Sequence, residues 1–182
     1  AELAVVRSAN DLLTYVVDPA VYDAQPFTTW DDGELTDRFD FNGRLVLDIG
    51  AGTGRLARAA AAAGARAGWA VEPVANLRRY LRDKARARGL DNVFAVDGLI
   101  EEIPFPAEFA DVVLGGHVFG DDLKAEYAEL RRVTRPGGVI VLCPGNTDVD
   151  AERHAFLTAA AFSWSRFEEP GYGVVRLYWQ RV

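Results

Sequence analysis

Apolar residues of this chain gather in short continuous runs separated by stretches of helical periodicity. The clearest runs cover residues 44–49, 66–71, 93–96, 111–114 and 139–143. A strand that is apolar at every position is covered on both of its faces, so these runs predict a parallel sheet between two layers of helices.

The segments between the runs predict the helices of these layers. Helices are expected at residues 53–63 and 74–88, and a third can be capped by Asp121 or Asp122 and stopped by Pro136-Gly137-Gly138. After residue 143 a helix is expected at residues 151–161. Two strands follow at residues 162–168 and 174–182, and their short connection predicts an antiparallel hairpin at one edge of the sheet. The pattern predicts one α/β domain with a doubly wound, mainly parallel sheet.

The clearest chemical signal lies between the first strand and the first helix. There the chain runs Asp48-Ile-Gly50-Ala51-Gly52-Thr-Gly54. Glycines allow a tight turn and a close approach of the backbone to a ligand, and open α/β sheets bind ligands at the carboxyl ends of central strands.

Acidic residues follow the next two strands at informative distances. Glu72 ends the second strand and Asp97 ends the third, so both should lie at the ligand edge of the sheet. Asp48 precedes the glycines, where its carboxylate would repel a pyrophosphate but could hold an ammonium group. A plain surface role for Glu72, and a helix N-cap for Asp97 before Gly98-Leu99, are the structural alternatives.

These motifs together resemble the class I S-adenosylmethionine-dependent methyltransferases over roughly residues 44–145. Residues 48–54 resemble the family's D-x-G-x-G-x-G motif, and Glu72, residues 96–98, 111–114 and 130–138 resemble its later motifs in order. The set looks closest to the branch acting on small molecules, which includes the ubiquinone and menaquinone methyltransferases.

The resemblance implies a Rossmann-like, seven-stranded sheet and a set of cofactor contacts. The backbone of residues 50–54 would face the methionine part of S-adenosylmethionine, Glu72 with Pro73 the ribose, and Asp97 with Gly98 and Leu99 the adenine. Carbonyls of Gly115 and Gly116 would face the cofactor's amino group, and S-adenosylhomocysteine would be the product.

One residue is a candidate for acid–base chemistry. His117 follows the fourth strand in the sequence GGHVFG, and an imidazole titrates near neutral pH. The alternative is that it packs beside the cofactor. His154 is expected at the surface, Cys143 in the core, and Arg78, Arg82 and Arg86 on the solvated face of a helix. No trusted ligand spacing predicts a metal.

Two other functions compete with methyl transfer. An NAD(P)-dependent oxidoreductase would need a third glycine at position 55, which is arginine. A non-catalytic domain that binds S-adenosylmethionine remains open, because the glycine motif alone does not show an acceptor pocket. The motifs of nucleobase and cytosine-C5 methyltransferases do not follow the fourth strand.

The N-terminal segment, residues 1–43, carries the whole net charge of −7. Its acids disfavour a nucleic-acid partner and favour a neutral or cationic small molecule. Its aromatic residues predict a lid over the ligand edge, with residues 44–182 as the cofactor-binding domain; the alternative is a loosely packed extension. These aromatics are Tyr15, Tyr22, Phe27 and Trp30. No apolar run is long enough to span a bilayer, and the single cysteine excludes an internal disulfide, so a cytoplasmic protein is expected.

Overall fold

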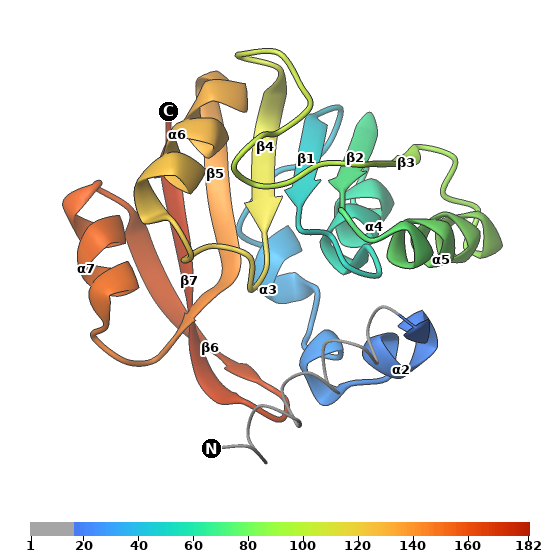
Figure 1. Cartoon of the computed structure of the whole chain (residues 1–182), viewed down its shortest axis with the longest axis horizontal. Helices are drawn as coiled ribbons and strands as arrows, with labels where there is room; N and C mark the ends of the chain where they lie inside the picture. The colour runs from blue at the N-terminus through green and yellow to red at the C-terminus, as the bar shows by residue number, and fades with distance from the viewer. Residues whose placement is uncertain (1–16) are drawn as a thin grey trace.

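The computed structural model describes residues 17–182 and builds them around a single sheet of seven strands. The strands are β1 (Leu45–Ile49), β2 (Ala67–Val71), β3 (Val93–Val96), β4 (Ala110–Gly115), β5 (Thr134–Thr147), β6 (Ser163–Glu169) and β7 (Gly173–Arg181). Their order across the sheet is β3-β2-β1-β4-β5-β7-β6, in which the first five are parallel and β7 pairs antiparallel with both β5 and β6 (Figure 1). This confirms the predicted fold class, including the C-terminal antiparallel hairpin.

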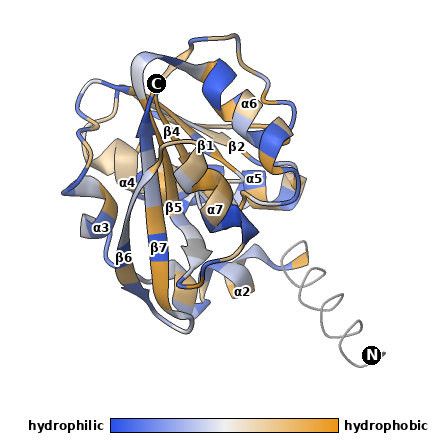
Figure 2. Ribbon diagram, turned by 90° about the vertical axis from the view of Figure 1, so that its left-hand side faces the viewer, coloured by the Kyte–Doolittle hydropathy of each residue, from blue (hydrophilic) through white to orange (hydrophobic). Residues whose placement is uncertain are grey.

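Helices cover the sheet on both faces. They are α2 (Pro19–Asp23), the short 3-10 helix η1 (Pro26–Thr28), α3 (Gly33–Thr36), α4 (Arg55–Ala62), α5 (Ala75–Ala87), α6 (Leu123–Val133) and α7 (Glu152–Ala159). Figure 2 shows α3 and α4 on one side of the apolar strands and α6 and α7 on the other. The side chains agree, since Leu56 and Ala60 of α4 pack with Val46, whereas Leu130 of α6 packs with Leu47.

Burial on both faces explains the continuous apolar runs. Every residue of β4 is buried, as are the last four of β1. The core also takes in part of the N-terminal segment: Trp30, Leu35 and Phe41 are buried in the same cluster as Val46. Residues 30–41 are thereby held against one face of the sheet.

Local interactions place the ends of the helices that border the ligand edge. Asp122 caps α6, its carboxylate accepting the backbone N–H groups of Lys124 and Ala125. The carboxylate of Glu72 accepts the N–H of Val74, the residue before α5 begins. Gly54 precedes α4 with a left-handed backbone (φ 76°), a conformation that costs glycine little.

One local expectation was wrong, and one structural alternative is excluded. The sequence Pro136-Gly137-Gly138 does not end α6, which stops at Val133; the chain enters β5 at Thr134 and passes through an irregular register opposite β4. Asp97 caps no helix, because residues 98–102 form a turn closed by a bridge between Leu99 and Glu102. In residues 17–182 no helix is long and apolar enough to cross a membrane.

Candidate functional site

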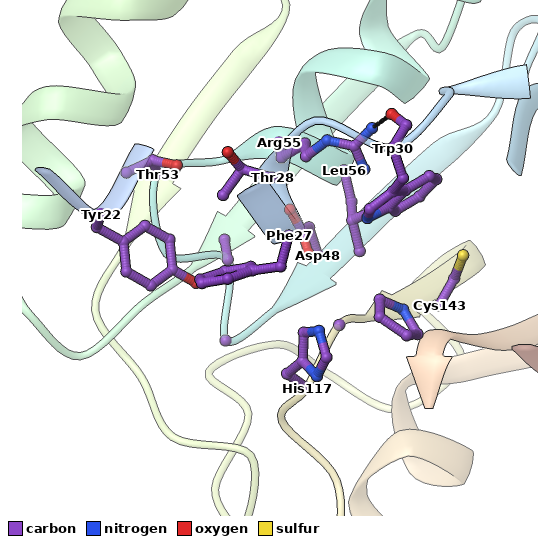
Figure 3. Close-up of a pocket in the computed structure, with 14 residues that line it drawn as sticks. Tyr22, Phe27, Thr28, Trp30, Asp48, Thr53, Arg55, Leu56, His117 and Cys143 are labelled. Carbon is purple, nitrogen blue, oxygen red and sulfur yellow. Dashed lines mark hydrogen bonds between the residues drawn. The ribbon is translucent and has the colours of Figure 1, made fainter. Parts of the chain in front are cut away.

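A pocket lies at the carboxyl ends of the central parallel strands, beside the glycine turn (Figure 3). The sequence-predicted residues that line it are Tyr22, Phe27, Trp30, Asp48, Gly50, Ala51, Gly116 and His117. The N-terminal segment and the turn after β1 therefore face each other across one cavity. Tyr15 lies outside the described residues.

The glycine turn is crowded from outside by other side chains. A Cβ on Gly50 would lie 2.4 Å from Val118 Cγ2, and one on Gly52 would lie 3.1 Å from Tyr22 Oη. Both glycines have a left-handed backbone, with φ of 64° and 55°. The turn can thus be built only with glycine at these two positions. Gly50 lines the pocket, whereas Gly52 is buried beneath Tyr22.

Asp48 brings a buried carboxylate to this pocket. Its Oδ2 accepts the N–H of Ala57 in the first turn of α4, at 2.9 Å. Burial raises the pKa of Asp48 to about 7. The hydrogen bond from Ala57 and the positive charge of Arg58 both lower this pKa, but burial has the larger effect. An ammonium group bound beside this carboxylate would remove the cost of its charge.

Glu72 lies behind the turn and is bonded to it. Its Oε2 accepts the N–H of Gly52 at 2.9 Å, and its Oε1 accepts the N–H of Val74 at the same distance. Burial raises the pKa of Glu72, and these two hydrogen bonds oppose the rise. With two backbone bonds and 5% exposure, Glu72 is not a plain surface acid. Each carboxylate oxygen can still accept a further donor.

Arg78 connects Glu72 to Asp97. Its guanidinium donates to the Glu72 carbonyl oxygen at 2.6 Å and to both carboxylate oxygens of Asp97, at 3.0 and 3.2 Å. The expectation that Arg78 lies on a solvated helix face was wrong, because its side chain is only 16% exposed. Arg82 and Arg86, farther along α5, are exposed as expected.

The residues predicted to frame an adenine line a second groove next to this chain of contacts. Asp97, Gly98 and Leu99 share that groove with the segment 102–105. Pro73 is exposed at the end of β2, and Gly115 is buried at the end of β4, behind Gly116. A continuous series of contacts thus runs from the pocket to the groove. It passes through the glycine turn, Glu72, Arg78 and Asp97.

His117 is held in an unusual position. It lines the pocket with a left-handed backbone (φ 56°), and its Nε2 lies 2.9 Å from Oε1 of Glu169, the last residue of β6. Glu169 is completely buried, and its Oε2 has no partner among the described residues. Glu169 was missed by sequence analysis because it lies 52 residues from His117 and at the end of an edge strand.

The aromatic residues of the N-terminal segment contact one another and the pocket wall. Phe27 meets Tyr22, His117 and Tyr172 edge to face, with ring centroids 5.4 to 5.9 Å apart. Trp30 is more deeply placed and packs on Phe167 of β6. Figure 3 shows the rings of Tyr22 and Phe27 together on one side of the pocket and His117 on another.

Ion pairs fasten this segment to the helices. Asp23, at the end of α2, pairs with Lys84 and lies 3.2 Å from the hydroxyl of Tyr80, both on α5. Arg55 of α4 pairs with Asp32 at 2.7 Å while its guanidinium lies over the ring of Trp30. Sequence patterns could not pair these residues, because the partners are 23 to 61 positions apart.

The remaining candidate side chains have structural surroundings. Cys143 is buried as predicted, and burial raises the pKa of its thiol. His154 is not a surface residue, since its side chain is 15% exposed and its Nδ1 lies 3.0 Å from the hydroxyl of Tyr178. Within residues 17–182 no group of three or more acids, histidines or cysteines is placed to hold a metal ion.

The geometry of this site agrees with a comparison to known families. Residues 46–138, from β1 to the start of β5, match the profile of the methyltransferase-domain family. That match covers half of the chain, and the chain belongs to this family. The resemblance drawn from the glycine and acidic motifs is thereby confirmed at the level of the superfamily.

Individual relatives share the same region. The malonyl-[acyl-carrier protein] O-methyltransferase of Serratia marcescens is 36% identical over 130 residues, which is 63% of this chain and 49% of that protein. The protein arginine N-methyltransferase PRMT10 of Oryza sativa subsp. japonica is 32% identical over 142 residues, which is 71% of this chain and 37% of that protein. The chain therefore spans less than half the length of either relative.

A solved structure shares nearly the whole fold. A SAM-dependent methyltransferase from Aquifex aeolicus superposes with a TM-score of 0.66 at 20% identity, over 91% of this chain and 99% of that one. At this identity the likeness concerns the fold alone.

Proposed function

We propose that this domain transfers a methyl group from S-adenosylmethionine to a small-molecule acceptor. The observation that carries the proposal is the buried carboxylate of Asp48 in a pocket beside the glycine turn, joined through Glu72 and Arg78 to the groove at Asp97. S-adenosylmethionine has an ammonium group at one end and an adenine at the other, with the ribose between them. Its transferable methyl group is bound to a sulfonium. The residues present fit those parts.

Each residue has a separate task in this proposal. Asp48 holds the ammonium group, Glu72 accepts the ribose hydroxyls with its remaining lone pairs, and the groove of Asp97, Gly98 and Leu99 takes the adenine. The protein contributes mainly orientation and exclusion of water, because methyl transfer from a sulfonium needs an aligned acceptor in a dry site. The assignment to the branch of the quinone methyltransferases stays a prediction of the motifs.

Replacing Glu72 by alanine should weaken the binding of S-adenosylhomocysteine at least tenfold, from an expected micromolar dissociation constant. The change removes two charge-assisted bonds to the ribose, each worth on the order of 1.5–3 kcal/mol. Calorimetric titration measures it, with Glu101→Ala, an exposed acid, as the matched control. Equal affinity in the Glu72→Ala protein would remove Glu72 from the cofactor site, provided that the thermal melt shows it folded.

The same titration distinguishes the competing functions. NAD(H) binding in place of S-adenosylhomocysteine would favour an oxidoreductase. Binding of S-adenosylhomocysteine, with no methyl transfer from S-adenosylmethionine in a separate activity assay, would favour a non-catalytic domain. A protein acceptor is the other candidate, because several relatives are named as histone-arginine or protein arginine methyltransferases. The enclosure of the pocket by Tyr22, Phe27 and Trp30 favours the small molecule.

The N-terminal segment serves, in this proposal, as a lid on the site. Its aromatic residues Tyr22 and Phe27 lie over Gly52 and beside His117, and Asp23 fastens it to α5. A ligand entering along the glycine turn must pass Tyr22. The lid would open by breaking the contacts of Asp23.

Replacing Asp23 by asparagine should therefore loosen the lid. Because the variant leaves Lys84 without its ionic partner in a partly buried place, we expect cleavage within residues 17–30 to become about tenfold faster. Limited proteolysis measures the rate, and S-adenosylhomocysteine should protect the wild-type segment. Asp37→Asn, an exposed acid without an ion pair in the described chain, is the control. Digestion that is identical with and without ligand would contradict a lid.

A further inference from the structure

The pair formed by His117 and Glu169 is the one acid–base arrangement of the described pocket in which the geometry is already complete. His117 follows β4 and Glu169 ends β6, so their contact joins the end of a central strand to the end of the edge strand, across β5 and β7. Their atoms Nε2 and Oε1 are 2.9 Å apart. A carboxylate accepts and does not donate, so this contact places a proton on Nε2 and leaves the lone pair on Nδ1.

The backbone at His117 is held against its preference. A non-glycine residue with φ of 56° costs on the order of 1 kcal/mol, and here the strain is fixed by the hydrogen bond from the His117 N–H to the carbonyl of Pro144, at 3.0 Å. Residues kept in such strain are concentrated at functional sites, because the surrounding fold must be built to hold them.

The imidazole is open on the side away from Glu169. Its side chain is 42% exposed, and Nε2 to Glu169 is its only ring hydrogen bond within residues 17–182. Two aromatic rings flank it: Phe27 at 5.9 Å and Tyr172 at 5.7 Å between centroids. Phe27 and Tyr172 also contact each other, with ring centroids 5.7 Å apart, so the three rings form one aromatic wall. A flat aromatic body packs against such a wall better than a charged or flexible one.

Charged groups approach the imidazole from several elements. Glu169 faces it from β6, and Asp48 of β1 and Arg55 of α4 share its pocket. Nη2 of Arg55 donates to Asp32 and to the carbonyl of Trp30, while its buried Nη1 has no partner among the described residues. The other titratable groups on its borders are the buried thiol of Cys143 and the phenol of Tyr172. A proton that arrives on Nδ1 would be stabilised by the buried carboxylate through Nε2.

We infer that His117 is the proton acceptor of this site, that Glu169 positions it, and that the methyl acceptor is a hydroxyl group on an aromatic ring. The inference rests on the proposed methyl transfer. The hydroxyl oxygen forms the new bond to the methyl carbon, the carbon–sulfur bond breaks with its electron pair on sulfur, and the hydroxyl proton passes to Nδ1 of His117. From there the proton leaves to solvent, to which the ring is exposed.

A proton acceptor of this kind distinguishes between acceptor classes. A carboxylate has no proton to lose, and an uncharged amine attacks with its own lone pair before any proton must leave. A neutral hydroxyl is the nucleophile that needs a base in place before the methyl group moves.

Nitrogen NMR of the imidazole tests the pair without any turnover. The chain has two histidines, so His117→Ala assigns the two ring signals of the labelled protein. In the free protein we expect the proton on Nε2, and its exchange with water should be at least tenfold faster in Glu169→Leu than in the wild type. Glu168→Gln, an exposed neighbour, is the control and should match the wild type. A proton on Nδ1, or equal exchange in Glu169→Leu, would overturn the pairing.

The acceptor class is tested on the same signals with a simple phenol. In the presence of S-adenosylhomocysteine, p-cresol should shift the Nδ1 resonance of His117, whereas toluene, which has the same shape without the hydroxyl, should not. Equal responses to the two, or none to p-cresol, would overturn the aromatic hydroxyl. Calorimetry with S-adenosylhomocysteine tests the proposed function separately. A wild-type protein that does not bind S-adenosylhomocysteine would contradict methyl transfer. The exchange result on His117 and Glu169 would still stand.

Discussion

Replacing Gly54 by alanine should lower the free energy of unfolding by about 2–5 kcal/mol. The alanine must adopt a left-handed backbone, and its Cβ would lie 2.4 Å from Cγ and 2.5 Å from Cδ1 of Leu81, which is fully buried between α4 and α5. The first effect costs about 1–2 kcal/mol and overpacking of a core about 1–3 kcal/mol. Urea unfolding measures the sum.

A second glycine separates these two causes. Gly89 has a similar φ of 68°, but nothing lies within 4 Å of the position of its Cβ, so Gly89→Ala should cost only about 1 kcal/mol. Shortening Leu81 to alanine in the Gly54→Ala protein should cost less than the two changes added together, because the smaller side chain makes room. Equal losses of stability in Gly54→Ala and Gly89→Ala would show that the contact with Leu81 does not contribute to the loss at Gly54.

Replacing Asp48 by asparagine should stabilise the protein at high pH while it weakens the site. The pKa of Asp48 is about 7 in the folded protein and about 3.8 as its ordinary value, so the folded state holds the proton more tightly than the unfolded state does. Ionisation of Asp48 therefore destabilises the fold increasingly between pH 4 and 7, by an amount on the order of 4 kcal/mol at most. Asparagine keeps an oxygen for the N–H of Ala57 and carries no charge.

The gain in stability of Asp48→Asn over the wild type should increase with pH. At pH 8 we expect Asp48→Asn to be more stable than the wild type by about 2–4 kcal/mol, and near pH 4 the difference should vanish because Asp48 is then protonated. Its affinity for S-adenosylhomocysteine should fall at least tenfold, since the ammonium group loses its carboxylate. Denaturation at both pH values, with the exposed Asp91→Asn as control, measures the first effect. A stability difference that does not change with pH would contradict a costly charge at Asp48.

The pattern of apolar residues predicted most strands of the sheet correctly, because a strand buried on both faces is apolar at every position. The buried strands β1 and β4 lie where uninterrupted apolar residues predicted them. So does β3, although it is an edge strand with Phe94 exposed. The extent of β5 was not predictable, because its pairing begins at Thr134, before Pro136-Gly137-Gly138, against a strand that is distant in sequence. Strand length is set by the neighbour that supplies the hydrogen bonds.

Charged residues were harder to interpret for a related reason. Arg78, at the start of α5, looks like one member of an exposed stripe, yet its partner Asp97 is 19 residues away on the turn after β3. Asp23 meets Lys84 across 61 residues. Such pairs leave no periodic trace in the sequence, because only the folded sheet and the helices packed on it bring them together.

The sequence by itself determined the glycine turn, the acidic residues at the ends of β2 and β3, and the order of strands and helices that puts them at one edge. These features depend on local backbone conformation and on burial, which are encoded by neighbouring residues. Only the tertiary structure decided that Glu169 completes His117, that Tyr22 lies over Gly52, and that Arg78 joins Glu72 to Asp97. Each of these is a contact between segments distant along the chain, and its free energy exists only once the sheet has brought the two together.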